Sequence, residues 1–164
     1  MDYAGHDGFT ATGEFRTKFN GYYKVRQKRK QWYVTYYELM EEQRTHQRSF
    51  EDLLCVMYPM SHSVEVSFVS KLMATIDPNL PIWDKYVIRN LGFERKWERL
   101  RSAEPKARIT EAGAIYQSIT SWYEGFSSTQ DGIACINKFD ELLPNYTDKL
   151  TAVKKLDYLL WSKR

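Results

Sequence analysis

The stretch SFVSKLMATIDPNLPIWDKYVIRNLG, residues 67–92, is the most regular part of this 164-residue chain. Its first ten residues place apolar side chains at the spacing of one helix face: Phe68, Val69, Leu72, Met73 and Ile76. Asp77-Pro78 ends this helix, because proline lacks the next hydrogen-bond donor and restricts the residue before it. A short loop then leads to Asp84 at the start of a second helix, and Gly92 stands where a left-handed helix cap belongs. Three small residues of the first helix leave room for another backbone to approach: Ser67, Ser70 and Ala74.

Helical patterns recur along the rest of the chain. A helix is predicted over residues 31–45, and Ser49 followed by Asp52 is typical of a capping box that opens a short helix ended by Pro59. Residues 93–108 are dense in charge and predict a solvated helix and a loop, and further helices are predicted over 110–126, 133–143 and 149–162. Because no convincing strand alternation occurs, we predict an all-α protein with a flexible lead-in over residues 1–14 and a single compact helical domain over 15–164.

The composition excludes several classes of protein. Hydrophobic residues make up 43% of the chain and aromatic residues 15%, which is too much for a disordered protein. Cys55 and Cys135 lie far apart outside any CxxC pair, and the chain has 3 histidines, so we expect neither a zinc site nor a disulfide framework but two buried free thiols in a reducing compartment. No apolar run reaches the roughly 18 residues of a membrane span, and no signal peptide is recognisable. We therefore expect a cytoplasmic protein that has no metal, no cofactor and no membrane partner, while the oligomeric state is left open.

In its order of helix, proline-containing loop, aspartate and helix, the segment over residues 67–92 resembles the helix-hairpin-helix DNA glycosylase superfamily. The sequence LDYLLW near the C-terminus, residues 156–161, is similar to the closing helix of small proteins related to that superfamily. The resemblance implies a glycosylase-like fold, DNA as partner, a role in DNA repair by base excision, and Asp84 as the catalytic residue.

The physical chemistry of Asp84 suits this role. Breaking an N-glycosidic bond builds positive charge on the sugar, and a carboxylate can stabilise that charge or orient the attacking water. A helix N-terminus keeps such a carboxylate ionised and fixed in place. The alternative is that Asp84 is an ordinary N-cap, since aspartate is a favoured cap residue.

The stretch that corresponds to the hairpin of these enzymes, residues 61–66, reads SHSVEV. It has neither the glycines whose amides grip DNA phosphate in the family nor the lysine nucleophile of the bifunctional members. We therefore expect a monofunctional hydrolase and no lyase chemistry. Lys71 is too close to Asp84 in sequence to match that lysine; it is either a substrate-binding residue or a structural lysine that snorkels or forms an ion pair.

Three further side chains bear on the site. Trp83 and Tyr86 flank Asp84 and could form aromatic walls for a flipped base, although Trp83 could equally belong to the core. Asp157 lies on the apolar stripe of the last helix, and a buried carboxylate is costly unless it is paired. We expect it to bond a basic side chain, Lys71 being one option, or backbone amides of a neighbouring loop; the alternative is that it reaches water at the edge of the stripe.

The stretch over residues 16–30 has seven Lys or Arg and no acid. Its cations lie among aromatic residues, a combination that suits phosphate neutralisation and base stacking. The residues expected to contact nucleic acid are Lys24, Arg26, Lys28, Arg29 and Lys30. The alternative is a solvated charged face whose aromatic residues belong to the core.

The sequence thus favours a DNA glycosylase-like protein that acts through Asp84. A non-catalytic descendant of that fold that binds nucleic acid or a protein, or an unrelated helical interaction module, is the alternative. The chain has none of the motifs GxGxxG, GxxxxGK[ST], HExxH or GxSxG.

Overall fold

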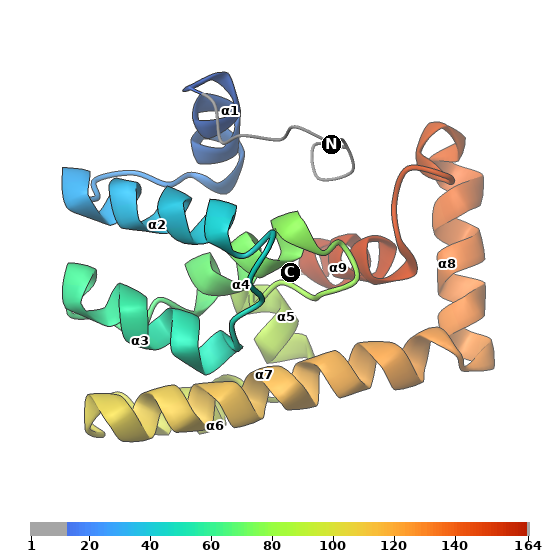
Figure 1. The fold of residues 1–164 in the computed structure, drawn as a ribbon. Coiled ribbons are helices and arrows are strands. Elements are labelled where there is room, and N and C mark those ends of the chain that lie inside the picture. The colour runs from blue at the N-terminus through green and yellow to red at the C-terminus, as the bar shows by residue number, and fades with distance from the viewer. Residues whose placement is uncertain (1–12, 164) are drawn as a thin grey trace.

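The computed structural model describes residues 13–163, and all the regular structure in this range is helical (Figure 1). The elements follow in the order α1 (Gly13–Tyr23), α2 (Lys30–Glu42), α3 (Phe50–Ser61), α4 (Val66–Ile76), α5 (Lys85–Asn90), α6 (Glu94–Arg99), α7 (Pro105–Ser127), α8 (Gln130–Leu142), a 3-10 turn (Pro144–Tyr146) and α9 (Ala152–Ser162). No strand occurs among these residues, which confirms the predicted all-α class. Most of the predicted lead-in, residues 1–12, lies outside the described residues, and its last two residues begin α1.

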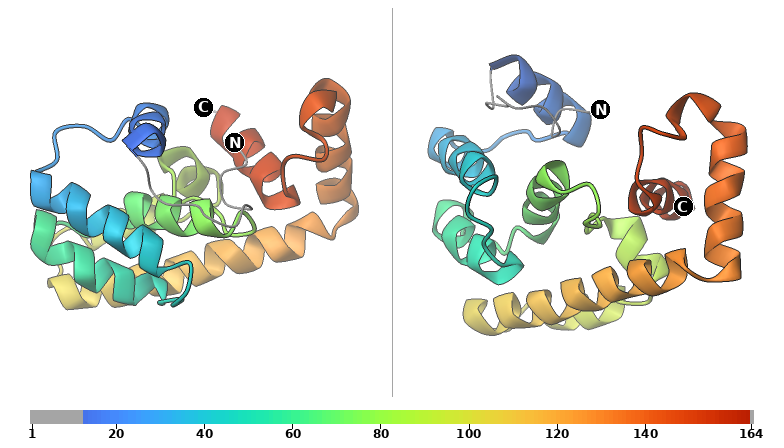
Figure 2. Two further views of the ribbon diagram at one scale, coloured as in Figure 1. Left: turned by 45° about the horizontal axis from the view of Figure 1, so that its top comes forward. Right: turned by 45° about the vertical axis from the view of Figure 1, so that its right-hand side comes forward.

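The long helix α7 runs along one side of the molecule and connects two groups of helices (Figure 1). Toward its N-terminal end it packs against α3, which also packs against α2 and α4. Toward its C-terminal end it contacts α8 and α9, and α9 packs in turn on α5 (Figure 2). The loop that joins α4 to α5 and ends at Asp84 therefore passes from the first group to the second.

A single hydrophobic cluster joins these helices. Its largest fully buried side chains come from five helices, α2, α3, α4, α7 and α9: Trp32, Tyr36, Tyr37, Met40, Leu53, Leu54, Met57, Leu72, Ile115, Ile119, Tyr123 and Leu156. The predicted apolar face of α4 points into this cluster, with Val69 and Leu72 fully buried. Aromatic stacking adds directional contacts, such as that between the rings of Phe50 and Tyr116 at 4.1 Å.

The local signals at two helix ends act as predicted. Ser49 caps α3: its Oγ accepts the N–H of Asp52 at 3.1 Å and donates to Asp52 Oδ2 at 2.7 Å. Gly92 adopts φ +79°, the left-handed conformation that glycine enters without steric cost. The prediction that Pro59 ends α3 is wrong, since the helix continues to Ser61. Pro59 lies in the exposed last turn, where water can satisfy the carbonyl that loses its donor.

One helix was not predicted, and the predicted burial of the cysteines needs correction. The sequence did not predict α1, whose Phe19 ring packs 5.9 Å from that of Tyr36. Such aromatic contacts hold a short polar helix that its own propensity would not form. Cys55 is exposed rather than buried, whereas Cys135 is half-buried, and both are free thiols.

Within residues 13–163, no helix combines the length and the hydrophobicity needed to cross a membrane.

Candidate functional site

Asp84 caps the N-terminus of α5. Its Oδ1 accepts the N–H of Tyr86 at 2.8 Å, and the side chain is half-buried. The loop before it is fastened to α4, because the N–H of Trp83 donates at 2.9 Å to the hydroxyl of Ser70, which is fully buried. Ser70 is thus one of the small residues at which the approach of another backbone was predicted, and that prediction is confirmed there.

Lys71 lies one helical position further on and is partly buried. Its ammonium stands 5.3 Å from the centre of the Tyr23 ring and 5.2 Å from that of Phe68, so it is held by two aromatic faces. Burial lowers the pKa of Lys71, while the negative charge of Asp84 acts in the opposite direction. The two side chains therefore interact electrostatically, although they form no ion pair of hydrogen-bonding length among the described residues.

The two aromatic neighbours of Asp84 take different places. Trp83 is 2% exposed and lies in the core, with its ring 6.2 Å from that of Phe50. The structure thus places Trp83 in the core, which is one of its two interpretations. Tyr86 is half-buried, with the cations of Lys85 and Arg89 each 6.0 Å from its ring.

Asp157 is buried, as expected for a carboxylate on the apolar stripe of α9. Its Oδ1 accepts the hydroxyl of Tyr123 at 2.6 Å and the backbone N–H of Ile82 at 3.4 Å, and its Oδ2 lies 3.4 Å from the ammonium of Lys154. Both predicted kinds of partner, a basic side chain and a loop amide, are present, and the cation is Lys154 rather than Lys71. Burial raises the pKa of Asp157, against the lowering effect of its partners, and lowers the pKa of Lys154.

One of the basic residues that precede α2, Lys28, contacts the end of the turn between α3 and α4. Lys28 donates at 2.5 Å to Glu65, the residue directly before α4, and its ammonium stands 4.9 Å from the centre of the Phe68 ring. Glu65 is 8% exposed, so this is a shielded ion pair. The four other predicted contact residues are exposed and have no ion pair with a described residue: Lys24, Arg26, Arg29 and Lys30. We call these four residues the cationic loop.

The aromatic residues beside the cationic loop are mostly structural. Phe19 and Trp32 belong to the core, Tyr23 and Tyr33 are half-buried, and Tyr22 is exposed. The hydroxyl of Tyr22 shares a 2.8 Å hydrogen bond with that of Tyr158 on α9. Of the predicted combination, the exposed cations are therefore present, whereas most of the aromatic rings are not exposed for stacking.

Sequence reasoning missed several members of the site. Glu65 carried no visible signal, because its partner Lys28 is 37 residues away. Lys154 could have been found, since it precedes Asp157 by three residues and so lies on the same side of a helix. Tyr123 could not, because its pairing with Asp157 depends on how α7 and α9 pack.

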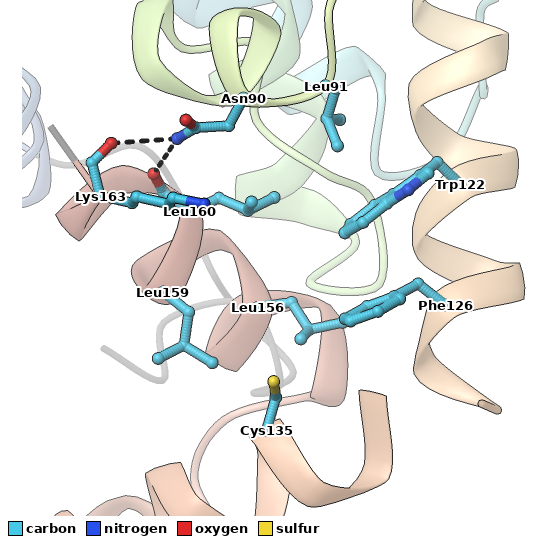
Figure 3. Close-up of a pocket in the computed structure, with 9 residues that line it drawn as sticks. All are labelled: Asn90, Leu91, Trp122, Phe126, Cys135, Leu156, Leu159, Leu160 and Lys163. Atoms are coloured by element: carbon cyan, nitrogen blue, oxygen red, sulfur yellow. Dashed lines mark hydrogen bonds between the residues drawn. The ribbon is translucent and has the colours of Figure 1, made fainter. Parts of the chain in front are cut away.

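A pocket of about 410 Å³ lies apart from these residues, between α5, α7, α8 and α9 (Figure 3). Trp122 and Phe126 stand side by side along one of its sides, and Leu156 and Cys135 face them. At its polar end the amide of Asn90 donates to the carbonyls of Leu160 and Lys163, at 2.9 and 3.0 Å.

Over residues 13–163, no three His, Cys, Asp or Glu side chains gather in a way that could hold a metal ion. Comparison of the chain with known proteins matches no family model, no curated protein and no solved structure. The comparisons therefore add no support for membership of the glycosylase superfamily, and what the structure supports is the coarser expectation, a compact all-helical protein.

Proposed function

We propose that this protein binds DNA at the turn of the α3–α4 hairpin and hydrolyses an N-glycosidic bond through Asp84, as a monofunctional base-excision glycosylase does. The observation that carries the proposal is the ion pair between Lys28 and Glu65, which fastens the cationic loop to the start of α4. Phe68 lies one turn further along α4 and contacts both Lys28 and Lys71, and Lys71 interacts with Asp84. Contacts along α4 thus link the cations proposed to bind phosphate to the carboxylate proposed for the chemistry. The resemblance of residues 67–92 to the superfamily points in the same direction.

The cationic loop supports DNA binding where the hairpin sequence alone does not. The turn over residues 62–65 has no glycine and no lysine, but Lys28, from another part of the chain, pairs with Glu65 at its end. The residues of the cationic loop are neighbours of Lys28 in the sequence. Lysine and arginine that neutralise phosphates release counterions, which gives affinity without sequence preference.

The chemistry proposed for Asp84 is hydrolysis. The oxygen of a water molecule bonds to the sugar C1′, the bond from C1′ to the base nitrogen breaks, and the departing base keeps the electron pair and receives a proton. The carboxylate stabilises the positive charge that develops on the sugar and accepts a proton from the attacking water. Among the described residues, the cap occupies Oδ1 of Asp84 and leaves Oδ2 for this role.

The catalytic part is tested by incubating the full chain with duplexes that carry uracil, oxidised or alkylated bases, followed by alkaline cleavage of abasic sites. We expect strand cleavage with one of these duplexes and its loss in Asp84→Asn. Asparagine is as good an N-cap as aspartate, so this variant keeps the helix start and removes only the charge. Activity that Asp84→Asn retains, or no activity on any duplex, contradicts the catalytic proposal.

The binding part is tested by titrating a labelled duplex at several salt concentrations. The double variant Arg26→Gln/Arg29→Gln is expected to flatten the dependence of log K on log salt by about two units, one for each phosphate that is no longer neutralised. The matched control is Lys138→Gln/Lys149→Gln, which removes the same charge from α8 and the segment before α9, far from the cationic loop (Figure 1). Equal effects of the two double variants would mean that net charge, and not the cationic loop, drives binding.

A second function is favoured by one specific observation. Trp83 lies in the core and so does not offer an open wall for a flipped base, which favours a non-catalytic nucleic-acid-binding descendant of such a fold. DNA binding that depends on the cationic loop, without cleavage of any duplex, is the result that selects this function.

A further inference from the structure

The loop that precedes Asp84 is held by side chains from two helices far along the chain. Three of its carbonyl oxygens accept hydrogen bonds of 2.6 to 2.9 Å: Pro78 from Thr151, Leu80 from Lys154, and Pro81 from the hydroxyl of Tyr116. Two of these donors belong to α9 or its cap and one belongs to α7. Because the loop has no regular structure of its own, these bonds replace the partners that a helix or a sheet would supply.

Asp157 is the centre of this arrangement. It accepts the N–H of Ile82, two residues before Asp84, and it lies beside the ammonium of Lys154, which in turn binds the carbonyl of Leu80. The hydroxyl of Tyr123 fixes the carboxylate from the side of α7. One buried side chain thus acts on the loop both directly, at Ile82, and through Lys154.

We propose that Asp157 is the positioning residue of Asp84: it orders the loop over residues 77–83 so that Asp84 is presented toward Lys71. The chemical consequence rests on the proposed function, whereas the ordering of the loop does not. Asp157 acts through the loop and not on a substrate, because its oxygens are occupied by Tyr123, Ile82 and Lys154.

The surroundings of Asp157 make this ordering sensitive to pH. The charged or titratable groups that face it are Lys154 on α9, Tyr22 and Tyr23 on α1, and Tyr116 and Tyr123 on α7, and the carboxylate of Asp77 also acts on Lys154. Tyrosines are neutral around neutrality, so Lys154 is the one cation of this set. Protonation of Asp157 at acid pH removes the charge that holds Lys154, and the loop is then expected to loosen.

The test is amide hydrogen exchange at Ile82, followed by NMR in the full chain. Asp157→Asn is expected to speed exchange of this amide by about tenfold or more, since a hydrogen bond to a carboxylate is stronger than one to a neutral amide. Leu72, in the core of α4, serves as the internal reference for global unfolding. Tyr123→Phe removes a single hydroxyl and is expected to act in the same direction with a smaller effect, which covers the case that Asp157→Asn folds poorly.

The matched control is Asp140→Asn. Asp140 forms an ion pair of 2.7 Å with Lys155 of α9, and this ion pair does not involve the loop. It is expected to leave exchange at Ile82 unchanged. In wild-type protein, protection of Ile82 should fall on acidification beyond the intrinsic pH dependence of exchange, and this extra fall should be absent in Asp157→Asn. Exchange at Ile82 that is unchanged in Asp157→Asn, or that rises only in step with Leu72, overturns the proposal.

Activity provides a second readout. If a duplex is cleaved, Asp157→Asn is expected to lower the single-turnover rate about tenfold with the Kd for DNA within about twofold. A loss of DNA affinity at an unchanged rate contradicts the positioning role. Absence of cleavage by wild-type protein refutes the catalytic proposal alone, because exchange at Ile82 decides the positioning role without any activity.

Discussion

Replacement of Ser70 by alanine isolates the bond that joins α4 to the loop before Asp84. The hydroxyl of Ser70 accepts the N–H of Trp83 at 2.9 Å and donates to the carbonyl of Ser67 at 3.0 Å. Ser70 is 0% exposed and Trp83 is 2% exposed, so no water can reach the N–H when the hydroxyl is gone. Because alanine fills nearly the same space, the substitution leaves a buried donor without a partner and makes no large cavity.

The magnitude follows from the cost of such a donor. A buried N–H that loses its partner destabilises a protein by about 1–3 kcal/mol. For a chain of this length, each kcal/mol lowers Tm by about 2–4 °C. The free energy of unfolding of Ser70→Ala is therefore expected to fall by about 2 kcal/mol, the middle of that range.

Urea denaturation followed by circular dichroism measures this change. Ser118→Ala is the matched control, because the exposed hydroxyl of Ser118 bonds the carbonyl of Ala114 within its own helix. Its free energy of unfolding should stay within about 0.5 kcal/mol of wild type, as for most surface substitutions. If Ser70→Ala is no less stable than Ser118→Ala, the bond from Trp83 does not anchor the loop.

Three further results are expected. Gly132→Ala should destabilise the protein by about 1–3 kcal/mol in the same urea assay, because the added Cβ would lie 1.8 Å from a backbone carbonyl oxygen of α7. The control is Gly125→Ala, which should be neutral or stabilising because the space around its Cβ is open. Equal effects of the two substitutions would refute the argument. A thiol reagent should modify exposed Cys55 faster than half-buried Cys135, as peptide mapping after brief labelling will show; the reverse order would contradict the structure. The free energy of unfolding should fall as pH rises above about 10, which is the pKa of tyrosine in the unfolded chain. The reason is that burial raises the pKa of six tyrosines in the folded state: Tyr22, Tyr23, Tyr36, Tyr37, Tyr116 and Tyr123. Flat thermal stability between pH 9 and pH 12 would refute this last expectation.

The elements that the sequence predicted correctly are those with a local physical cause. The apolar spacing of α4, the cap at Ser49 and the left-handed Gly92 each depend on neighbouring residues, and each is present. The burial of Asp157 was predictable for the same reason, since its position on an apolar stripe leaves few alternatives.

What the sequence did not predict depends on contacts between distant segments. The helix α1 is held by aromatic packing on α2, and the ion pair of Lys28 with Glu65 joins residues that two helices separate in the chain. The bond between Tyr123 and Asp157 requires the packing of α7 on α9. No pattern within a short window carries this information, because each partner alone is an ordinary lysine, glutamate or tyrosine.

The cap role of Asp84 and its proposed chemical role are compatible, since they use different properties of one side chain. The cap needs a single oxygen that accepts the N–H of Tyr86, and Oδ1 supplies it. The chemistry needs negative charge at a fixed position, and the cap provides the fixation while the helix N-terminus favours the ionised form. A helix cap is therefore no argument against catalysis here. The decisive comparison is between side chains that cap equally and differ in charge, which is why Asp84→Asn separates the two roles.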